Sequence, residues 1–208
     1  MLYIRHFLPS ATLLVAFSSS ASAAIVVYTN QAIWSSRVAI DGLVVEQETF
    51  NSIKPGEYAS PFGGSTASVE WSAQADNGLF VQDGVLSTNS PETLTFTFTP
   101  GVRAVGGNFF GTDIDFQNAS VIFTVALSNG TSYTGEASSP ASFTGFRSTT
   151  AATISSLSID VEPAAGFTDV PAVFPSVDNL YFGVTAPAPG AVALLGAAGL
   201  IGLRRRRN

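Results

Sequence analysis

The chain has 208 residues, a formal net charge of −6 at pH 7, one histidine (His6) and no cysteine. This inventory excludes the Ser-His-Asp triad, cysteine nucleophiles, haem ligation and ordinary zinc sites from the chain beyond its first residues. Residues 24–186 hold all 15 acidic side chains but only four basic ones, a formal charge of −11, which disfavours nucleic acid and anionic lipid as partners.

The first 23 residues have the organisation of a secretory signal peptide. A basic start with Arg5 precedes a short apolar stretch at residues 11–17, and the small residues Ala21-Ser22-Ala23 follow it directly. This order is typical of a cleaved export signal, whereas a buried N-terminal helix would not need the small-residue pattern. We therefore expect cleavage between Ala23 and Ala24 and export of the mature chain.

Residues 24–184 are predicted to form one domain built mainly of strands. Val, Thr, Phe, Ser and Gly dominate this part, a composition typical of β-structure. The exception is NQAIWSSRV, where Asn30 can cap a short helix whose Ile33 and Trp34 dock on a sheet. Strands are predicted at residues 25–29, 44–50, 68–71, 79–86, 92–100, 104–111, 121–127, 153–161 and 177–184.

Two of these segments alternate strictly between apolar and polar residues. Leu94, Phe96 and Phe98 alternate with threonines, and residues 121–127 follow the same rule before the turn signal Asn129-Gly130 and a further strand through Tyr133. Many short strands separated by turn residues indicate an all-β fold. We expect an antiparallel β-sandwich of jelly-roll type, with one short N-terminal helix and a C-terminal hydrophobic helix.

Residues 185–208 differ from the domain before them. Ala191–Leu203 contains no charged residue, and as a helix its 13 residues would span about 20 Å, less than a bilayer core of about 30 Å. Pro187 and Pro189 precede this segment, and it is followed by four consecutive arginines, Arg204, Arg205, Arg206 and Arg207. The positive-inside rule would hold these arginines in the cytoplasm while the exported domain lies outside.

This tail resembles the PEP-CTERM sorting signal of Gram-negative bacteria. Pro187-Ala188-Pro189 stands where the signal has Pro-Glu-Pro, AVALLGAAGLIGL stands for its glycine-interrupted apolar helix, and Arg204–Arg207 for its terminal arginine cluster. Ala188 departs from the usual Glu, a Pro-Ala-Pro variant. The resemblance implies transient anchoring in the inner membrane, removal of the tail by an exosortase, and release to an exopolysaccharide-rich surface or biofilm matrix. The alternative is a plain C-terminal anchor that is never cut.

The resemblance extends along the body of the chain. The segments AAIVVYTNQAIWSS, VVEQETFNSIKPGEY, FTGFRSTTAATISSLSID and SVDNLYFG are similar to those of PEP-CTERM β-sandwich proteins, which begin with a short aromatic-bearing helix and end in an Asp-Asn strand. It implies a fold more than an activity.

Candidate functional residues are few and mostly acidic. A glycosidase needs two carboxylates facing across about 5 to 10 Å, and the candidates are Glu46, Glu48, Glu70, Asp113 and Asp115. Composition favours solvated surface positions for them. The pattern Asp113-Ile114-Asp115 allows a hard cation, although turn capping is the favoured interpretation.

Two low-specificity binding sites are also predicted. Trp71 lies near predicted turns and is the best candidate for a ring that stacks on a sugar, with burial in the core as the favoured alternative. A structural Ca²⁺ is predicted where Glu48 and Asn51 meet Asp178 and Asn179, because several jelly-roll carbohydrate-binding modules look similar there and because Ca²⁺ takes oxygen ligands.

From these features we expect a non-enzymatic structural or adhesive protein of the cell surface. An extracellular polysaccharide-binding module is the alternative, and a carboxylate-based glycoside hydrolase is a distant third. A groove with two or more exposed aromatic rings would favour sugar binding, a smooth Ser/Thr face would favour a structural role, and an enzyme would need facing carboxylates in a cleft.

Overall fold

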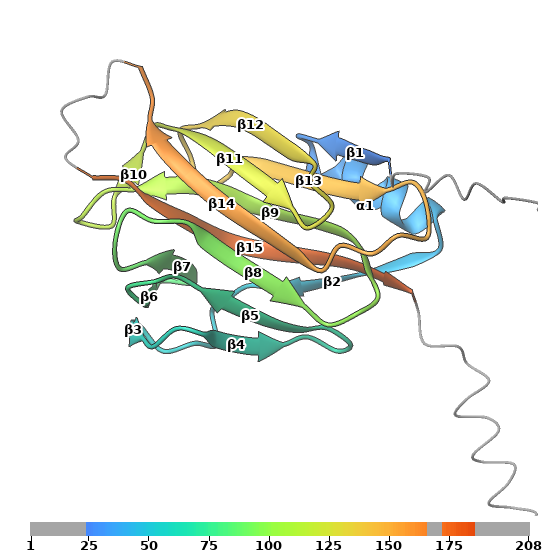
Figure 1. Ribbon diagram of the computed structural model, residues 1–208, viewed down its shortest axis with the longest axis horizontal. Coiled ribbons are helices and arrows are strands. Elements are labelled where there is room, and N and C mark those ends of the chain that lie inside the picture. The colour runs from blue at the N-terminus through green and yellow to red at the C-terminus, as the bar shows by residue number, and fades with distance from the viewer. Residues whose placement is uncertain (1–23, 166–171, 186–208) are drawn as a thin grey trace, which may run out of the picture.

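Strands dominate the fold because apolar and small polar residues alternate along most of the chain. The computed structural model describes residues 24–165 and 172–185, which form two antiparallel sheets packed face to face and one helix (Figure 1). The prediction of an all-β antiparallel sandwich is therefore confirmed. Within these residues no helix has the length and apolar character needed to cross a membrane.

The two sheets, called sheet A and sheet B, take their strands from all parts of the chain. Sheet A has the order β1 (Ile25–Tyr28), β13 (Phe143–Ser148), β9 (Val102–Thr112), β15 (Phe174–Thr185), β7 (Val85–Thr88), β6 (Leu79–Gln82) and β3 (Gly56–Tyr58), with β10 (Asn118–Ala119) on β9 and β2 (Leu43–Glu48) on β15. Sheet B has the order β12 (Ser132–Ala137), β11 (Val121–Leu127), β14 (Ser156–Pro163), β8 (Leu94–Phe98), β5 (Glu70–Gln74) and β4 (Phe62–Ser65).

The connections between the sheets are those of a jelly roll. The order β2-β15-β9-β13 in sheet A faces the order β8-β14-β11-β12 in sheet B. The chain crosses from one sheet to the other between β8 and β9, between β12 and β13, and again before and after β14. This interleaving of two Greek keys closes the sandwich around one core.

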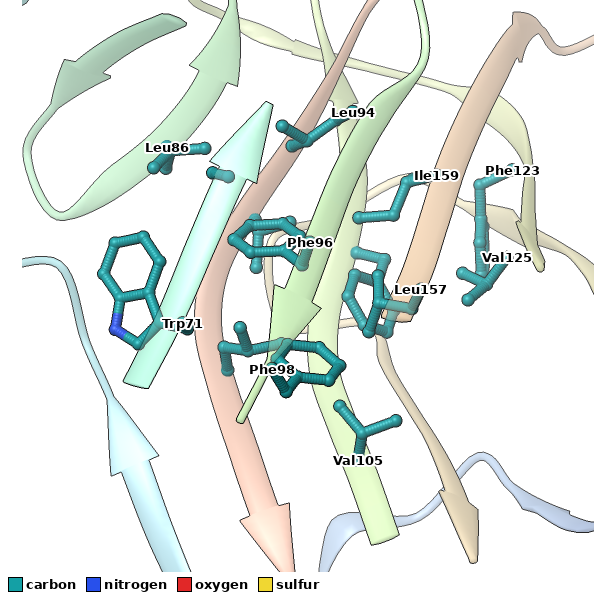
Figure 2. Packing of buried hydrophobic residues seen from close by; sticks show 14 of the residues in the cluster. Trp71, Leu86, Leu94, Phe96, Phe98, Val105, Phe123, Val125, Leu157 and Ile159 are labelled. Carbon is teal, nitrogen blue, oxygen red and sulfur yellow. The ribbon is translucent and has the colours of Figure 1, made fainter. Parts of the chain in front are cut away.

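The core lies between the sheets and follows the predicted alternation. Leu94, Phe96 and Phe98 of β8 are buried, and their threonine neighbours point away from the core (Figure 2). On β11 the residues Val121, Phe123, Val125 and Leu127 are buried in the same way. The period of two thus sets which face of sheet B packs on sheet A.

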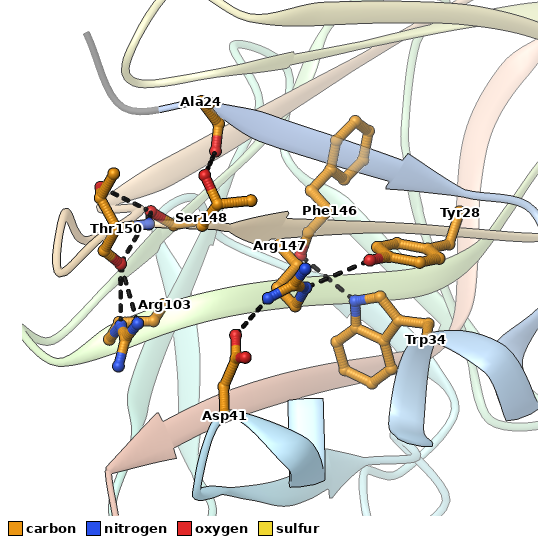
Figure 3. A network of polar contacts seen from close by, with 10 residues as sticks. Ala24, Tyr28, Trp34, Asp41, Arg103, Phe146, Arg147, Ser148 and Thr150 are labelled. Atoms are coloured by element: carbon orange, nitrogen blue, oxygen red, sulfur yellow. Dashed lines mark hydrogen bonds and ion pairs between the residues drawn. The ribbon is translucent and has the colours of Figure 1, made fainter. Parts of the chain in front are cut away.

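Helix α1 (Gln31–Ile40) covers one end of the outer face of sheet A. The Asn30 side chain caps it by accepting a hydrogen bond from the backbone N–H of Ile33 (3.0 Å), as predicted. Trp34 docks on the sheet, fully buried, and its ring N–H donates to the carbonyl of Phe146 at 3.2 Å (Figure 3). The expected docking of Ile33 is wrong: its side chain is 55% exposed, because Val38, one turn after Trp34, shares the buried face.

An ion pair links the end of α1 to β13. Arg147 of β13 bonds Asp41 at the end of the helix, and its Nε donates to the Tyr28 hydroxyl at 3.1 Å (Figure 3). The hydrogen bond that Arg147 donates to Tyr28 comes first among the effects that raise the pKa of Arg147, so this guanidinium stays charged. The contacts tie β1, α1 and β13 together.

Several strands differ from the predictions. The single strand expected at residues 79–86 is the hairpin β6–β7, because Asp83 (φ 51°) and Gly84 (φ 78°) form its two-residue turn. The strand expected to begin at Ser68 begins at Glu70. The strands β3, β4 and β10 are short, and β13 shows no alternation because sheet B covers one of its faces and α1 the other.

A bulge interrupts β15 where its neighbour on one edge changes. The first part of β15 pairs with β7 and the second part with β2, from Leu180 onward. The register shifts between Val177 and Leu180, so Asp178 and Asn179 together stand opposite the single residue Asn108 of β9. The bulge therefore lies on the border between the covered and the open end of the outer face of sheet A.

Candidate binding groove on sheet A

Three adjoining hollows mark the open end of the outer face of sheet A. Their volumes are about 330, 440 and 250 Å³; the first shares Glu57 and Asn89 with the second, and Gln82, Thr112 and Phe116 with the third. We call this continuous depression the acidic groove. It is bordered by β3, by the β6–β7 hairpin, and by the loop of residues 113–117 that follows β9.

Two aromatic rings meet within the acidic groove, which Tyr58, Phe110 and Phe174 also line. Phe80 projects from β6 on the outer face, since its neighbours Leu79 and Val81 point into the core. Phe116 comes from the loop 113–117 and meets Phe80 edge to face, with ring centroids 5.3 Å apart. Both rings are half-buried, so part of each remains available to a ligand.

The loop 113–117 is held in one shape by Asp113. Its Oδ1 accepts hydrogen bonds from the backbone N–H groups of Asp115 (3.0 Å) and Gln117 (2.8 Å). The turn interpretation of Asp113-Ile114-Asp115 is therefore confirmed. Phe116 carries a conformational cost here, because its φ of 61° lies in the left-handed region that bulky residues avoid.

The floor of the groove is a chain of buried hydroxyl groups. Ser176 of β15 lies 2.9 Å from both Thr112 and Ser87, and Ser87 donates to the carbonyl of Pro175 at 3.1 Å. One direction of donation, from Thr112 through Ser176 to Ser87, satisfies every hydroxyl proton in this chain. The floor is thus polar, rigid and self-satisfied, and a ligand would contact mainly the rim.

Trp71 is not a platform for sugars. The predicted stacking role is wrong, because the side chain is only 3% exposed and packs against Phe50 and Phe96 in the core. Its ring N–H donates to Oε2 of Glu48 at 3.0 Å, while Oε1 of the same carboxylate accepts from the backbone N–H of Phe50 at 2.8 Å. Glu48 therefore serves the core edge between β2 and β5.

Glu46, two residues before Glu48 on β2, stabilises the same edge of the core between sheet A and sheet B. Its carboxylate accepts hydrogen bonds from the hydroxyls of Thr66 and Ser68 and from the Ser68 backbone N–H at 2.9 Å. Burial acts to raise the pKa of Glu46, but these hydrogen bonds outweigh it and lower the pKa below its usual range. Glu46 and Glu48 thus join sheet A to sheet B and do not face each other across a cleft.

The four residues predicted to bind Ca²⁺ point to different places. Glu48 points toward Trp71 in sheet B, and Asn51 lies against the turn at Gly84. Asn179 is on the outer face, where it accepts a hydrogen bond from Gln47 at 2.7 Å. Within the described residues no group of three or more acidic side chains is placed to hold a metal ion.

Asp178 is half-buried beside Asn179 in the bulge of β15. Burial raises the pKa of Asp178. Burial also raises the pKa of Tyr181, and the negative charge of Asp178 adds to that rise. Only Asp178 and Asn179 therefore remain together from the predicted set, and calcium binding stays a prediction.

The outer face of sheet B contrasts with the groove. Cross-strand hydroxyls bond one another on it: Thr95 with Ser158 at 3.1 Å and Thr124 with Thr134 at 2.9 Å. Other hydroxyl residues of this face are Ser65, Ser72, Thr97, Ser132 and Ser156. The face is rich in Ser and Thr, which the sequence analysis associates with a structural role, and it also carries the exposed acids Glu70, Glu136 and Glu162.

The predicted sorting residues lie outside the described part of the chain, as does the predicted C-terminal helix, so the structure does not test them. They comprise the cleavage residue Ala23, the motif Pro187-Ala188-Pro189, and the arginine cluster of Arg204, Arg205, Arg206 and Arg207. Ala24, on the other side of the expected cleavage, is exposed, and its carbonyl accepts a hydrogen bond from the Thr149 backbone N–H at 3.0 Å. Processing of both ends therefore stays a prediction.

The last of the candidate acids, Glu70, is exposed on β5. It lies beside neither Asp113 nor Asp115, which belong to the loop after β9 on sheet A. The chain matches no family model, no curated protein and no solved structure. The residues and their geometry therefore carry the functional argument.

The acidic groove itself was missed by sequence reasoning. Phe80 and Phe116 are 36 positions apart, and the apolar run at residues 79–86 favours one strand although Asp83-Gly84 is a hairpin signal. Recognising that turn would have placed Ser87 and Val85 of β7 beside Phe80 and Gln82. Nothing in the sequence would have brought the loop 113–117 beside them.

Proposed function

We propose that this protein is an exported, non-catalytic β-sandwich that attaches to extracellular glycan through the acidic groove. The observation that carries the proposal is the meeting of Phe80 and Phe116, two half-buried rings at a polar groove. Aromatic faces pack against the apolar faces of sugar rings, while side chains such as Gln82 and Asn89 can bond the hydroxyls. This combines the expected adhesive role with polysaccharide binding.

Catalysis fits the groove less well than binding does. Of the acids first considered for a hydrolase, Glu46 and Glu48 support the sandwich edge, and Asp113 uses one carboxylate oxygen to hold its own loop. A glycosidase instead needs one acid free to protonate the leaving group and a second one facing it. We therefore propose no hydrolytic role for these residues.

The proposed location rests on the two ends of the chain. The signal-peptide pattern of residues 1–23 and the PEP-CTERM-like tail support export, transient inner-membrane anchoring, processing by an exosortase, and a final place on the cell surface or in the matrix. Intact-mass measurement of the surface-extracted protein should show a C-terminus near Pro189. Mature molecules that all retain Arg204–Arg207 would contradict processing and leave a permanent anchor.

A structural role is the second candidate, and the hydroxyl-rich outer face of sheet B favours it. Two pairs of its hydroxyls bond one another, so these groups need no outside partner where the face borders other molecules. A structural protein of this kind would not depend on the groove rings.

Binding of the full chain, purified in mild detergent, to insoluble polysaccharides tests the proposal. Phe80→Ala and Phe116→Ala together should reduce retention at least about tenfold, since central aromatic residues dominate most binding sites. Thr95→Val with Thr124→Val on sheet B is the matched control and should leave retention unchanged. Equal loss in both double variants, or no retention of the wild type on any neutral, amino or acidic polysaccharide, would contradict glycan binding.

A further inference from the structure

The charged side chains along the acidic groove all carry the same sign. Five carboxylates line its three hollows, those of Glu57, Asp76, Asp83, Asp113 and Asp115. No lysine or arginine of the described chain is among the lining residues. A ligand in the groove is therefore exposed to a negative electrostatic potential along its whole length.

The three arginines of the described chain, which could neutralise this potential, lie elsewhere in the fold. Arg147 is paired with Asp41 beneath α1, and Arg103 donates two hydrogen bonds to the carbonyl of Thr150. Arg37 lies on the outer side of α1, beside Ile33 and Ile40. The fourth basic residue of the described chain, Lys54, is exposed in the loop before β3, where its carbonyl accepts a hydrogen bond from the Tyr58 hydroxyl, and it does not line the hollows. The groove thus keeps a net negative charge, with five carboxylates along it and one lysine near its edge.

Four of the five groove carboxylates are also unengaged. Glu57, Asp76, Asp83 and Asp115 are exposed, and their carboxylates accept no hydrogen bond from the rest of the described chain. By contrast, the carboxylate of Glu92 accepts two hydrogen bonds from Asn77, as Glu46 and Glu48 do from their partners. The groove acids are therefore not needed to hold the sandwich together.

The spacing of these acids determines the kind of cation that fits. They are spread over β3, the β5–β6 turn, the β6–β7 turn and the loop 113–117, and they form no group able to hold a metal ion among the described residues. Separate carboxylates along a groove suit a ligand whose positive charges are also separate. Free amino groups on successive sugars have that arrangement, and the rings of Phe80 and Phe116 suit the sugars themselves.

We propose that the acidic groove selects glycans that carry free amino groups, such as polymers of glucosamine, over neutral and uronic acid polymers. The proposal rests on the glycan-binding function above and names its ligand class. Phe80 and Phe116 contact the sugar rings, and Glu57 and Asp115 pair with ammonium groups on either side. Uronic acid polymers are repelled by the same carboxylates.

The test is a titration of the full chain, in mild detergent at pH 5.5, with three hexasaccharides. Glucosamine hexamer should bind about tenfold more tightly than N-acetylglucosamine hexamer, and galacturonate hexamer should bind least. The preference should shrink as salt is raised from 0.05 to 0.5 M, because the Debye length falls. Hexalysine, the probe for a basic peptide, should bind more weakly than the glucosamine hexamer because it has no sugar rings.

Variants that replace carboxylates by amides test whether the groove acids cause the preference for the glucosamine hexamer. Glu57→Gln with Asp115→Asn should remove most of the preference for the glucosamine hexamer and leave binding of the N-acetylglucosamine hexamer unchanged. Glu136→Gln with Glu162→Gln, which removes two exposed acids of sheet B, is the matched control and should keep the preference.

The outcomes separate this proposal from the one on which it depends. Equal binding of the amino and neutral hexamers, or tighter binding of galacturonate, would overturn the ligand class but leave glycan binding in place. Equal loss in both variant pairs, or hexalysine binding as tightly as the glucosamine hexamer, would also overturn it. Binding of no hexasaccharide would overturn glycan binding itself.

Discussion

The two outer faces of the sandwich differ although they belong to sheets of similar composition. Sheet A carries α1 at one end and the acidic groove at the other, with unengaged carboxylates and two half-buried rings along the groove. On sheet B, two pairs of hydroxyls bond across neighbouring strands. Polar groups that satisfy one another leave little for a ligand, so recognition is expected on sheet A and an inert border on sheet B.

The largest effect should come from uncovering sheet A. Trp34→Ala removes the fully buried ring that joins α1 to the sheet and should lower the free energy of unfolding by about 3–5 kcal/mol. Urea unfolding of the full chain measures it. Ile33→Ala, at the exposed neighbouring position, is the control and should change stability by less than about 0.5 kcal/mol. Similar losses in both variants would mean that α1 is not fixed by Trp34.

The edge that joins the two sheets should be the next most sensitive place. Glu48→Ala leaves the buried ring N–H of Trp71 without an acceptor, and we expect a loss of about 1–3 kcal/mol. The same unfolding experiment on Glu48→Gln, which keeps one acceptor oxygen, should show a smaller loss. If Glu48→Ala were as stable as the wild type, the carboxylate would not support the sandwich edge.

The contribution of Asp178, at the border of the groove, to the free energy of unfolding should change with pH in the opposite direction to that of a hydrogen-bonded acid. Because burial raises its folded pKa above the unfolded value, ionisation favours the unfolded chain as pH rises. Asp178→Asn should therefore stabilise the protein at pH 7 by less than about 1 kcal/mol after solvent screening, and the gain should vanish below about pH 3.8. Unfolding curves at pH 7 and pH 3 measure the difference, and a gain that grows at pH 3 would contradict it.

The same variant tests the predicted calcium site. Calcium should raise the melting temperature of the wild type, but not of Asp178→Asn, if Asp178 and Asn179 bind the ion. Equal melting of the wild type in calcium and in chelator would show that the bulge serves the fold alone.

The smallest effect should come from sheet B. Thr124→Val with Thr134→Val replaces a bonded pair of hydroxyls by apolar groups of the same shape, which is close to neutral. The free energy of unfolding should stay within about 0.5 kcal/mol of the wild type. A loss comparable to that of Glu48→Ala would show that the hydroxyl ladder stabilises the fold and is more than a border.

The fold was predictable where one face of a strand is buried and the other is not. Leu94, Phe96 and Phe98 show this alternation, and Asn30 is a local capping signal that needs no tertiary contact. Strand β13 escaped prediction because it is covered on both faces. Likewise, Trp71 could not be assigned to core or surface until Glu48 was seen to accept its ring N–H across 23 residues.

Hydrogen exchange of the full chain, with and without bound glycan, tests most directly the claim that sheet A recognises a ligand and sheet B does not. The ligand should slow amide exchange in the turn at Asp83-Gly84 and in the loop 113–117, and leave the sheet B turn at residues 128–131 unchanged. Protection confined to sheet B, or spread equally over both faces, would contradict the assignment of recognition to the acidic groove.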